Sequence, residues 1–161
     1  MNTEEKRQRL EQLARALRES GLPMTPQRRA VFESMLDSED HPTADDVYAT
    51  VRKQLPEISR MTVYRILSHL VVLRLLSKIC HPGSVARYDP KLQQHHHLVC
   101  LDCGEIVDLE EERLNQLAWP DVRRFGFEIE DYHVNFRGRC AACRQAANKS
   151  KKQQTKRRKS S

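Results

Sequence analysis

Two Cys-x-x-Cys pairs are the residues of this sequence whose types and spacing most directly specify a chemistry. Cys100 and Cys103 form the first pair, Cys140 and Cys143 form the second, and 36 residues lie between them. Each pair is a short knuckle that can place two sulfur atoms on one ion, and two pairs complete the tetrahedral shell of Zn2+. The alternative is a redox dithiol. We predict structural zinc, with no catalysis, because a closed tetrahedron has no open position.

A run of three histidines precedes the first cysteine pair, in a segment that we expect to be a β-strand. Side chains alternate between the two faces of a strand, so His95 and His97 point one way while His96 and Cys100 point the other. This strand therefore offers ligands to two different metal sites. One site is the soft thiolate site, and the other is a harder nitrogen and oxygen site through His95, His97 and nearby carboxylates.

Three further side chains are candidate ligands of the harder site. His41 lies in the turn before the third expected helix, Asp89 lies at the junction of the two halves, and Asp108 follows the first cysteine pair by five residues. Spacing alone leaves the alternative open, namely solvated carboxylates and an ordinary turn histidine.

The first 90 residues have the order of a winged helix-turn-helix domain. Helical periodicity and capping residues predict helices over 3–19, from Pro26 after Thr25, after Thr43 and after Ser59. Two short strands, 75–80 and 85–88, then flank a turn at 81–84, and Cys80 is expected to serve as a small apolar residue. The face of the fourth helix opposite its apolar stripe carries Arg60, Tyr64, Arg65 and Ser68. DNA binding is the preferred interpretation of this face, and a merely solvated face is the alternative.

The second half is expected to be a small α+β lobe. Strands are predicted over 96–100, 106–109 and 127–136, and one helix over 110–125 with an interruption at Pro120. A lobe of this size cannot bury a large core alone, so we expect it to close on a second copy of itself. The domains are then 1–90, with a hinge at about 89–94, 95–145 for dimerisation and metal binding, and a disordered basic tail over 146–161.

Charge and composition narrow the class of protein further. The chain has 161 residues and a formal net charge of +6, but eight Lys and Arg lie after residue 143, so residues 1–143 sum to −2. The tail could be a solubilising end or a sequence-independent DNA clamp, and we favour DNA contact. No apolar run is long enough for a membrane span and no signal peptide is visible, so we expect a cytoplasmic protein whose cysteines bind metal.

Five separated motifs carry a resemblance to a known family. They are Met24-Thr25-Pro26-Gln27-Arg28, His41-Pro42-Thr43-Ala44-Asp45-Asp46, Thr62-Val63-Tyr64-Arg65, the His-x-His before Cys-x-x-Cys-Gly, and the closing Cys-x-x-Cys. In order and spacing they resemble the ferric uptake regulator family, over about residues 10 to 145. The resemblance implies an α+β chain in which an N-terminal winged helix-turn-helix domain precedes a C-terminal α+β dimerisation domain.

The resemblance also implies which residues act. The family's regulatory metal site falls on His41, Asp89, His95, His97 and Asp108, and its structural zinc falls on Cys100, Cys103, Cys140 and Cys143. Such a regulatory set suits Fe(II) or Mn(II) in geometry and hardness. An ion bound by all five would fasten one lobe to the other and hold the recognition helices of a homodimer at the spacing of successive major grooves.

The resemblance implies a particular set of contacts with double-stranded DNA. Tyr64, Arg65 and Ser68 would face the bases, with Arg65 able to contact guanine, whereas Arg28 and Arg60 would contact phosphates.

The branch of the family is indicated by single positions. Zinc-sensing members typically have Cys where Asp89 stands, and iron-sensing members usually have Glu at the position of Asp108, where the peroxide-sensing branch has Asp. Arg65, in contrast, resembles the iron-sensing branch. The auxiliary metal site of the iron branch matches Gln94, His96 and roughly Tyr132, with His133 one place off. Only His96 among the matching positions is a good ligand, so that site is expected to be absent or altered.

Three hypotheses follow from the sequence. The first is a dimeric, metal-dependent transcriptional repressor that senses peroxide, in which Fe(II) lets peroxide oxidise His41 or His95. The second is an iron-responsive repressor of metal-uptake genes. The third, from a different class, is a zinc-dependent hydrolase, which would need an open zinc and a general base. We expect no enzyme, because four cysteines fill the obvious zinc site and no nucleophile–base pair is visible.

Overall fold

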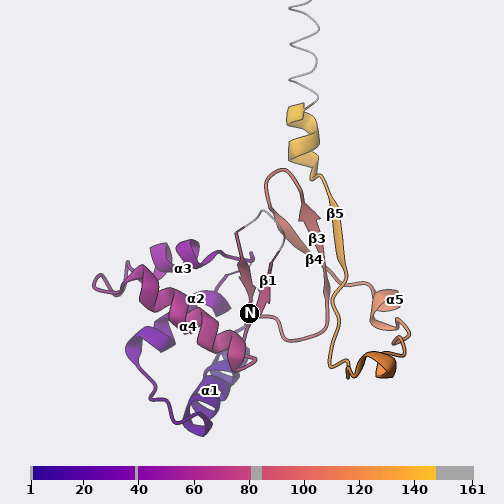
Figure 1. Cartoon of the computed structure of the whole chain (residues 1–161). Helices are drawn as coiled ribbons and strands as arrows, with labels where there is room; N and C mark the ends of the chain where they lie inside the picture. The colour runs from indigo at the N-terminus through magenta and orange to yellow at the C-terminus, as the bar shows by residue number, and fades with distance from the viewer. Residues whose placement is uncertain (1, 39, 81–84, 148–161) are drawn as a thin grey trace, which may run out of the picture. The chain divides into compact units, whose positions relative to one another are not determined.

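The computed structural model describes residues 2–38, 40–80 and 85–147, and the chain divides after Gln93 into two compact units (Figure 1). The predicted turn at 81–84 and residues 148–161 of the predicted tail lie outside the described residues. Within the described ranges, the first unit consists of four helices and a two-stranded hairpin, and the second contains a three-stranded sheet. None of these helices combines the length and the apolar character that crossing a bilayer requires.

Each helix of the first unit begins at a side-chain cap. The cap oxygen accepts a hydrogen bond from a backbone N–H three residues later, which satisfies a donor that the helix itself leaves unpaired. The helices and their caps are α1 (Thr3–Glu19, Asn2), α2 (Pro26–Leu36, Thr25), α3 (Ala44–Val51, Thr43) and α4 (Arg60–Val72, Ser59). These starts confirm the four predicted helices.

The apolar core of the chain lies in the first unit. The α4 side chains Val63, Leu67 and Leu70 are almost wholly buried, and they belong to one cluster with residues of the other three helices. The opposite face of α4 is exposed, as the periodicity predicted. This division of α4 into a buried and an exposed face orients its polar residues toward solvent.

A short antiparallel hairpin follows α4. Strand β1 (Ser77–Ile79) pairs with β2 (Arg87–Asp89), and Ser77 lies opposite Asp89. The strands are shorter than the predicted ranges 75–80 and 85–88. The exposed Cys80 contradicts the expectation of a packed apolar residue.

The other edge of β2 pairs with the turn that contains His41. The Tyr88 N–H donates to the Pro42 carbonyl at 3.0 Å, and the Arg87 guanidinium donates to the His41 carbonyl at 2.7 Å. This pairing places the turn at 41–43 beside Asp89, the last residue of β2.

The sheet of the second unit is built around β3 (His96–Cys100). Strand β4 (Ile106–Leu109) pairs with it antiparallel, and β5 (Asn135–Gly138) pairs with it in parallel, which gives the order β4-β3-β5. The strands β3 and β4 confirm the predicted ranges 96–100 and 106–109. Residues 141–147, which follow β5, are helical (Figure 1).

The segment between β4 and β5 differs from the prediction. The helix predicted over 110–125 is reduced to α5 (Glu112–Asn115) and a 3-10 turn η1 (Arg123–Phe125), and the strand predicted over 127–136 is reduced to β5. Pro120 interrupts the helix, and Trp119 and Phe127 remain 53% and 72% exposed, so within the described residues their burial contributes little to the stability of a longer element.

We predict that Leu67→Ala lowers the free energy of unfolding of the first unit by about 2–5 kcal/mol, because it removes a wholly buried side chain from the core. Chemical denaturation followed by circular dichroism measures this change. The matched control is Val72→Ala on the same helix, where a 78% exposed side chain is shortened. A control that destabilises as much as Leu67→Ala would contradict this account of the core.

Candidate metal centres

Four cysteines converge at one end of the sheet of the second unit. Cys100 ends β3, Cys140 follows β5, and the parallel pairing that sets Cys100 opposite Gly138 brings the two strand ends together. The four sulfur atoms lie within 4.8 Å of one another, and those of Cys103 and Cys140 are 3.8 Å apart. The four converging residues are Cys100, Cys103, Cys140 and Cys143.

Backbone geometry closes the first cysteine knuckle. Gly104 has a φ of +71°, which a side chain would disfavour, and its N–H donates to the Cys100 carbonyl at 3.0 Å. The Cys140 N–H donates toward the Cys100 sulfur at 3.4 Å, and backbone N–H donors of this kind lower the pKa of Cys100 to about 6. The neighbouring Cys140 thiol, in contrast, raises the pKa of Cys143.

This donor set fits zinc. The four cysteines carry no disulfide, and their sulfur atoms are close enough to share one ion. A bound Zn2+ ion would take all four as thiolates, in the closed tetrahedral arrangement that proteins use for structural sites.

A second group of ligands lies in the same unit, between β3 and β4. The strand register sets His97 opposite Asp108. The Asp108 Oδ1 atom is 3.6 Å from His95 Nε2 and 3.9 Å from His97 Nε2, and the two imidazole rings meet edge to face with centroids 4.7 Å apart. Both histidines are 2% exposed and the Asp108 side chain is 23% exposed, so the group consists of two buried nitrogen donors and one partly buried carboxylate. Such a set suits Fe(II), Mn(II) or Zn2+.

His133 was not predicted as part of any site, yet it supports this group. Its Nδ1 is 3.3 Å from the His95 carbonyl oxygen, and its ring stacks on His97 with centroids 6.3 Å apart. The sequence placed His133 inside the strand predicted over 127–136 and one position from the match to the auxiliary site, whereas in the structure it precedes β5.

The remaining two candidate ligands lie together in the first unit. His41 Nε2 is 3.6 Å from Asp89 Oδ2, and both side chains are buried, with exposed fractions of 6% and 2%. The pairing of β2 with the turn at 41–43 accounts for their proximity. The other Asp89 oxygen, Oδ1, accepts a hydrogen bond from the Lys91 N–H at 2.8 Å.

His96 faces away from the two flanking histidines and has a different role. Its ring is wholly buried, stacks on Tyr132, and accepts a hydrogen bond at Nδ1 from the Val134 N–H at 3.2 Å. Burial lowers the pKa of His96, with partial opposition from the Asn115 side chain, so the ring is neutral at pH 7. A neutral ring that accepts at Nδ1 carries its hydrogen on Nε2, which leaves no lone pair for a metal ion.

The predicted DNA contacts fall into two groups. Tyr64, Arg65 and Ser68 are exposed on α4. Arg28 and Arg60 already have partners, since the Arg28 guanidinium donates to the Pro23 carbonyl, and Arg60 forms an ion pair with Asp45 at 2.9 Å. A phosphate contact from Arg60 would therefore compete with this ion pair.

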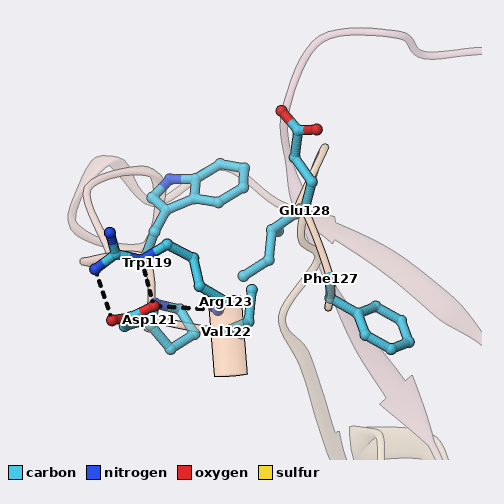
Figure 2. A pocket seen from close by; sticks show the side chains of 8 residues that line it. Trp119, Asp121, Val122, Arg123, Phe127 and Glu128 are labelled. Carbon is cyan, nitrogen blue, oxygen red and sulfur yellow. Dashed lines mark hydrogen bonds and ion pairs between the residues drawn. The ribbon is translucent and has the colours of Figure 1, made fainter. Parts of the chain in front are cut away.

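The second unit also has a hollow of about 580 Å³ between η1 and the segment that follows it (Figure 2). Figure 2 shows the Trp119 indole beside the ion pair of Asp121 and Arg123, which are joined at 2.9 Å, and Phe127 pointing away from them. Its lining holds no histidine or cysteine. The hollow thus combines apolar side chains with the Asp121–Arg123 ion pair and has neither the nitrogen nor the sulfur ligands found in the two metal sites.

Comparison with known proteins places these features in context. The sequence profile of the ferric uptake regulator family matches residues 19–137. The ferric uptake regulation protein of Bacillus subtilis (strain 168) is 37% identical over 140 residues, which cover 84% of this chain and 94% of that protein. The peroxide-responsive repressor PerR of Staphylococcus aureus (strain Mu50 / ATCC 700699) is 30% identical over 134 residues, covering 83% and 90%.

A solved structure gives the same result for the fold. The structure of the Helicobacter pylori ferric uptake regulator Fur, described as having three functional metal binding sites, has a TM-score of 0.72 and 24% identity. The similarity covers 86% of this chain and 93% of that one. It confirms the predicted α+β fold class.

We predict that Cys143→Ser abolishes stable zinc binding and the order of the second unit, because three thiolates cannot close the tetrahedron and zinc binding is coupled to folding. Zinc content by elemental analysis and the near-ultraviolet signal of Trp119 measure the two losses. The matched control is Cys80→Ser, which alters the one cysteine outside the cluster. Full zinc retention in Cys143→Ser would show that Cys143 is not a ligand.

Proposed function

Because the chain belongs to the ferric uptake regulator family, we propose that it is a metal-dependent transcriptional repressor that binds double-stranded DNA as a homodimer in the cytoplasm. The family match covers residues 19–137, and the two relatives are named as a regulation protein and a repressor. These names disfavour the alternative of a zinc-dependent hydrolase. The observation that carries the metal dependence is the convergence of the buried His95 and His97 with the partly buried Asp108.

The first unit supplies the DNA-binding surface. Its helix α4 follows α3 as the second helix of a helix-turn-helix and presents Tyr64, Arg65 and Ser68 to solvent. Arg65 can donate two hydrogen bonds to the O6 and N7 atoms of guanine in the major groove, and Tyr64 adds an apolar edge. Arg28 and Arg60 contribute phosphate contacts once they exchange their present partners.

The second unit supplies the dimer interface. Its side chains Leu117, Trp119, Phe127 and Phe136 are between 45% and 72% exposed, and all four residues of β5 are exposed. An edge strand and apolar side chains of this kind are the surfaces that a second copy covers. Homodimerisation sets two copies of α4 at a fixed separation, which a palindromic operator requires.

Regulation follows if one ion draws ligands from both units. We propose that His41 and Asp89 of the first unit join His95, His97 and Asp108 of the second in binding Fe(II) or Mn(II). Ligands from both units favour one relative arrangement of the units over all others, because the full set is complete only there. The arrangement so favoured is the one that binds DNA.

Two effectors are compatible with this mechanism, and each has support. Asp108 resembles the peroxide-sensing branch, and a relative 30% identical is named a peroxide-responsive repressor. A bound Fe(II) ion would supply the redox chemistry by which peroxide oxidises a ligand histidine. Iron-responsive repression is the second candidate, since a relative 37% identical is named a ferric uptake regulation protein.

We predict that Asp108→Asn weakens metal-dependent DNA binding at least about tenfold, because it replaces the one carboxylate that faces both His95 and His97. Fluorescence anisotropy on DNA selected in vitro by the Mn(II)-loaded protein measures this effect. Asp102→Asn is the matched control, because Asp102 lies in the same unit and is paired only with the exposed Arg139 among the contacts described. A variant whose DNA binding responds to Mn(II) as the wild type does would exclude Asp108 from the site.

We further predict that hydrogen peroxide inactivates the Fe(II)-loaded protein and spares the Mn(II)-loaded protein. The iron form should gain one oxygen atom on His41 or His95 and release its DNA, which intact mass, peptide mapping and DNA retention measure on the zinc-loaded dimer. The manganese form is the internal control. If both forms keep their mass and their DNA, the chain is an iron- or manganese-dependent repressor and peroxide is not its signal.

A further inference from the structure

Arg9 is a partly buried cation on α1 whose hydrogen bonds reach far along the chain. Its Nη1 donates to the Pro90 carbonyl at 2.8 Å, and its Nη2 donates to the Leu75 carbonyl at 2.7 Å. Its Cζ atom lies 5.7 Å from the ring centroid of the wholly buried Phe32. Arg7, on the same helix, pairs instead with Glu4 and Glu11 of α1, so the two hydrogen bonds of the Arg9 guanidinium to distant carbonyls have a different role.

The two carbonyls that Arg9 contacts lie at the base of the β1–β2 hairpin. Leu75 precedes β1 by two residues, and Pro90 directly follows β2, whose last residue, Asp89, pairs with Ser77. The guanidinium therefore joins the two chain segments where the backbone ladder ends. A hairpin of two three-residue strands has little stability of its own, so this contact fixes the place where the chain leaves the first unit.

The fixed segment carries Asp89. The Asp89 Oδ1 atom accepts from the Lys91 N–H, which closes a turn around Pro90, and Oδ2 is directed at His41. Arg9 donates to the Pro90 carbonyl at the centre of this turn. Because the same planar guanidinium also bonds to Leu75, it fixes both the distance and the direction of the turn relative to the start of the hairpin. The direction of the Asp89 carboxylate thus depends on a side chain 80 residues earlier in the sequence.

The position of Arg9 lies outside the stretch that the family profile matches, which begins at residue 19. Helix α1 precedes that stretch except for its last residue, Glu19. Its attachment to the base of the hairpin is an observation of this structure.

We infer that Arg9 is a positioning residue for the metal response, in that its fork to Leu75 and Pro90 holds the Asp89 turn in the geometry that binds the regulatory ion. The inference rests on the proposed function, in which Asp89 is a ligand. It assigns to α1 a part in setting the metal concentration at which the protein responds.

Two possible roles of Arg9, as a nearby charge or as a positioning group, predict opposite changes in metal affinity when Arg9 is replaced. If Arg9 acted only as a nearby positive charge, its removal would relieve repulsion and tighten the binding of a divalent cation. If Arg9 acts by holding the turn, its removal weakens binding, as the loss of outer-shell contacts to metal ligands does, by about tenfold. The sign of the change separates the two roles.

The test is a Mn(II) titration of the full-length, zinc-loaded dimer, with free Mn(II) followed by electron paramagnetic resonance. Arg9→Gln removes both the positive charge and the paired hydrogen bonds to the Leu75 and Pro90 carbonyls. Arg9→Lys keeps the charge and cannot form the pair in the same geometry. Arg7→Gln is the matched control, because Arg7 lies on the same helix, is 60% exposed and bonds only to residues of α1 in the contacts described. Asp89→Asn, titrated in parallel, reports on the proposed ligand itself.

We expect both Arg9 variants to bind Mn(II) about tenfold more weakly, with Arg7→Gln unchanged. At saturating Mn(II) the DNA affinity of both variants should fall with their Mn(II) affinity, and by no more than the same factor, because Asp89 is a proposed ligand only in the DNA-binding arrangement. Tighter or unchanged Mn(II) binding in Arg9→Gln, or wild-type Mn(II) binding in Arg9→Lys, would each overturn the inference. If Asp89→Asn also has no effect, the proposed regulatory site is wrong; if Asp89→Asn alone weakens binding, that site stands and the role of Arg9 falls.

Discussion

The scarcity of apolar core in the second unit is the constraint on which the rest of the structure depends. In the described residues, the apolar cluster is drawn entirely from the first unit, whereas Val99 and Cys100 alone are buried apolar residues of the second. A sheet of three short strands needs another source of stability. Four thiolates on one zinc ion can supply it at one end of the sheet, and a second copy of the chain can supply it over the exposed aromatic side chains.

Strand β3 allows this small unit to hold two kinds of metal ligand. Because side chains alternate along a strand, His97 faces the Asp108 carboxylate while His96 is directed to the Tyr132 side. Cys100, at the end of the strand, lies with Cys103, which precedes β4, and with Cys140 and Cys143, which follow β5. The thiolate site therefore anchors the strand that carries His97, a proposed ligand of the regulatory ion, so we expect loss of zinc to displace His97 as well.

The parts of the fold that the sequence predicted well are those set by local interactions. Capping by Thr25, Thr43 and Ser59 and the apolar spacing of each helix depend on neighbours within a few residues, and these starts were correct. The segment over 110–134 was predicted wrongly because several of its apolar side chains, Leu117, Trp119, Phe125 and Phe127, stay largely exposed in the described chain, so the apolar spacing did not reflect burial. The contacts of Arg9 and His133 were not predicted, because each side chain bonds to the backbone of a residue distant in sequence.

The division of the proposed ligands between the units limits how strongly metal can regulate DNA binding. Three ligands, His95, His97 and Asp108, converge within the second unit by strand pairing alone, so an ion can bind them whatever the position of the first unit. Only the contribution of His41 and Asp89 distinguishes the DNA-binding arrangement from the others, and a ligand shifts an equilibrium only by its differential affinity. Coupling energies of this kind are about 1–3 kcal/mol. Arg9, which orients Asp89, therefore affects the part of the metal-binding free energy that differs between the DNA-binding arrangement and the others. Replacing Arg9 changes how strongly metal promotes DNA binding and leaves the group of His95, His97 and Asp108 intact.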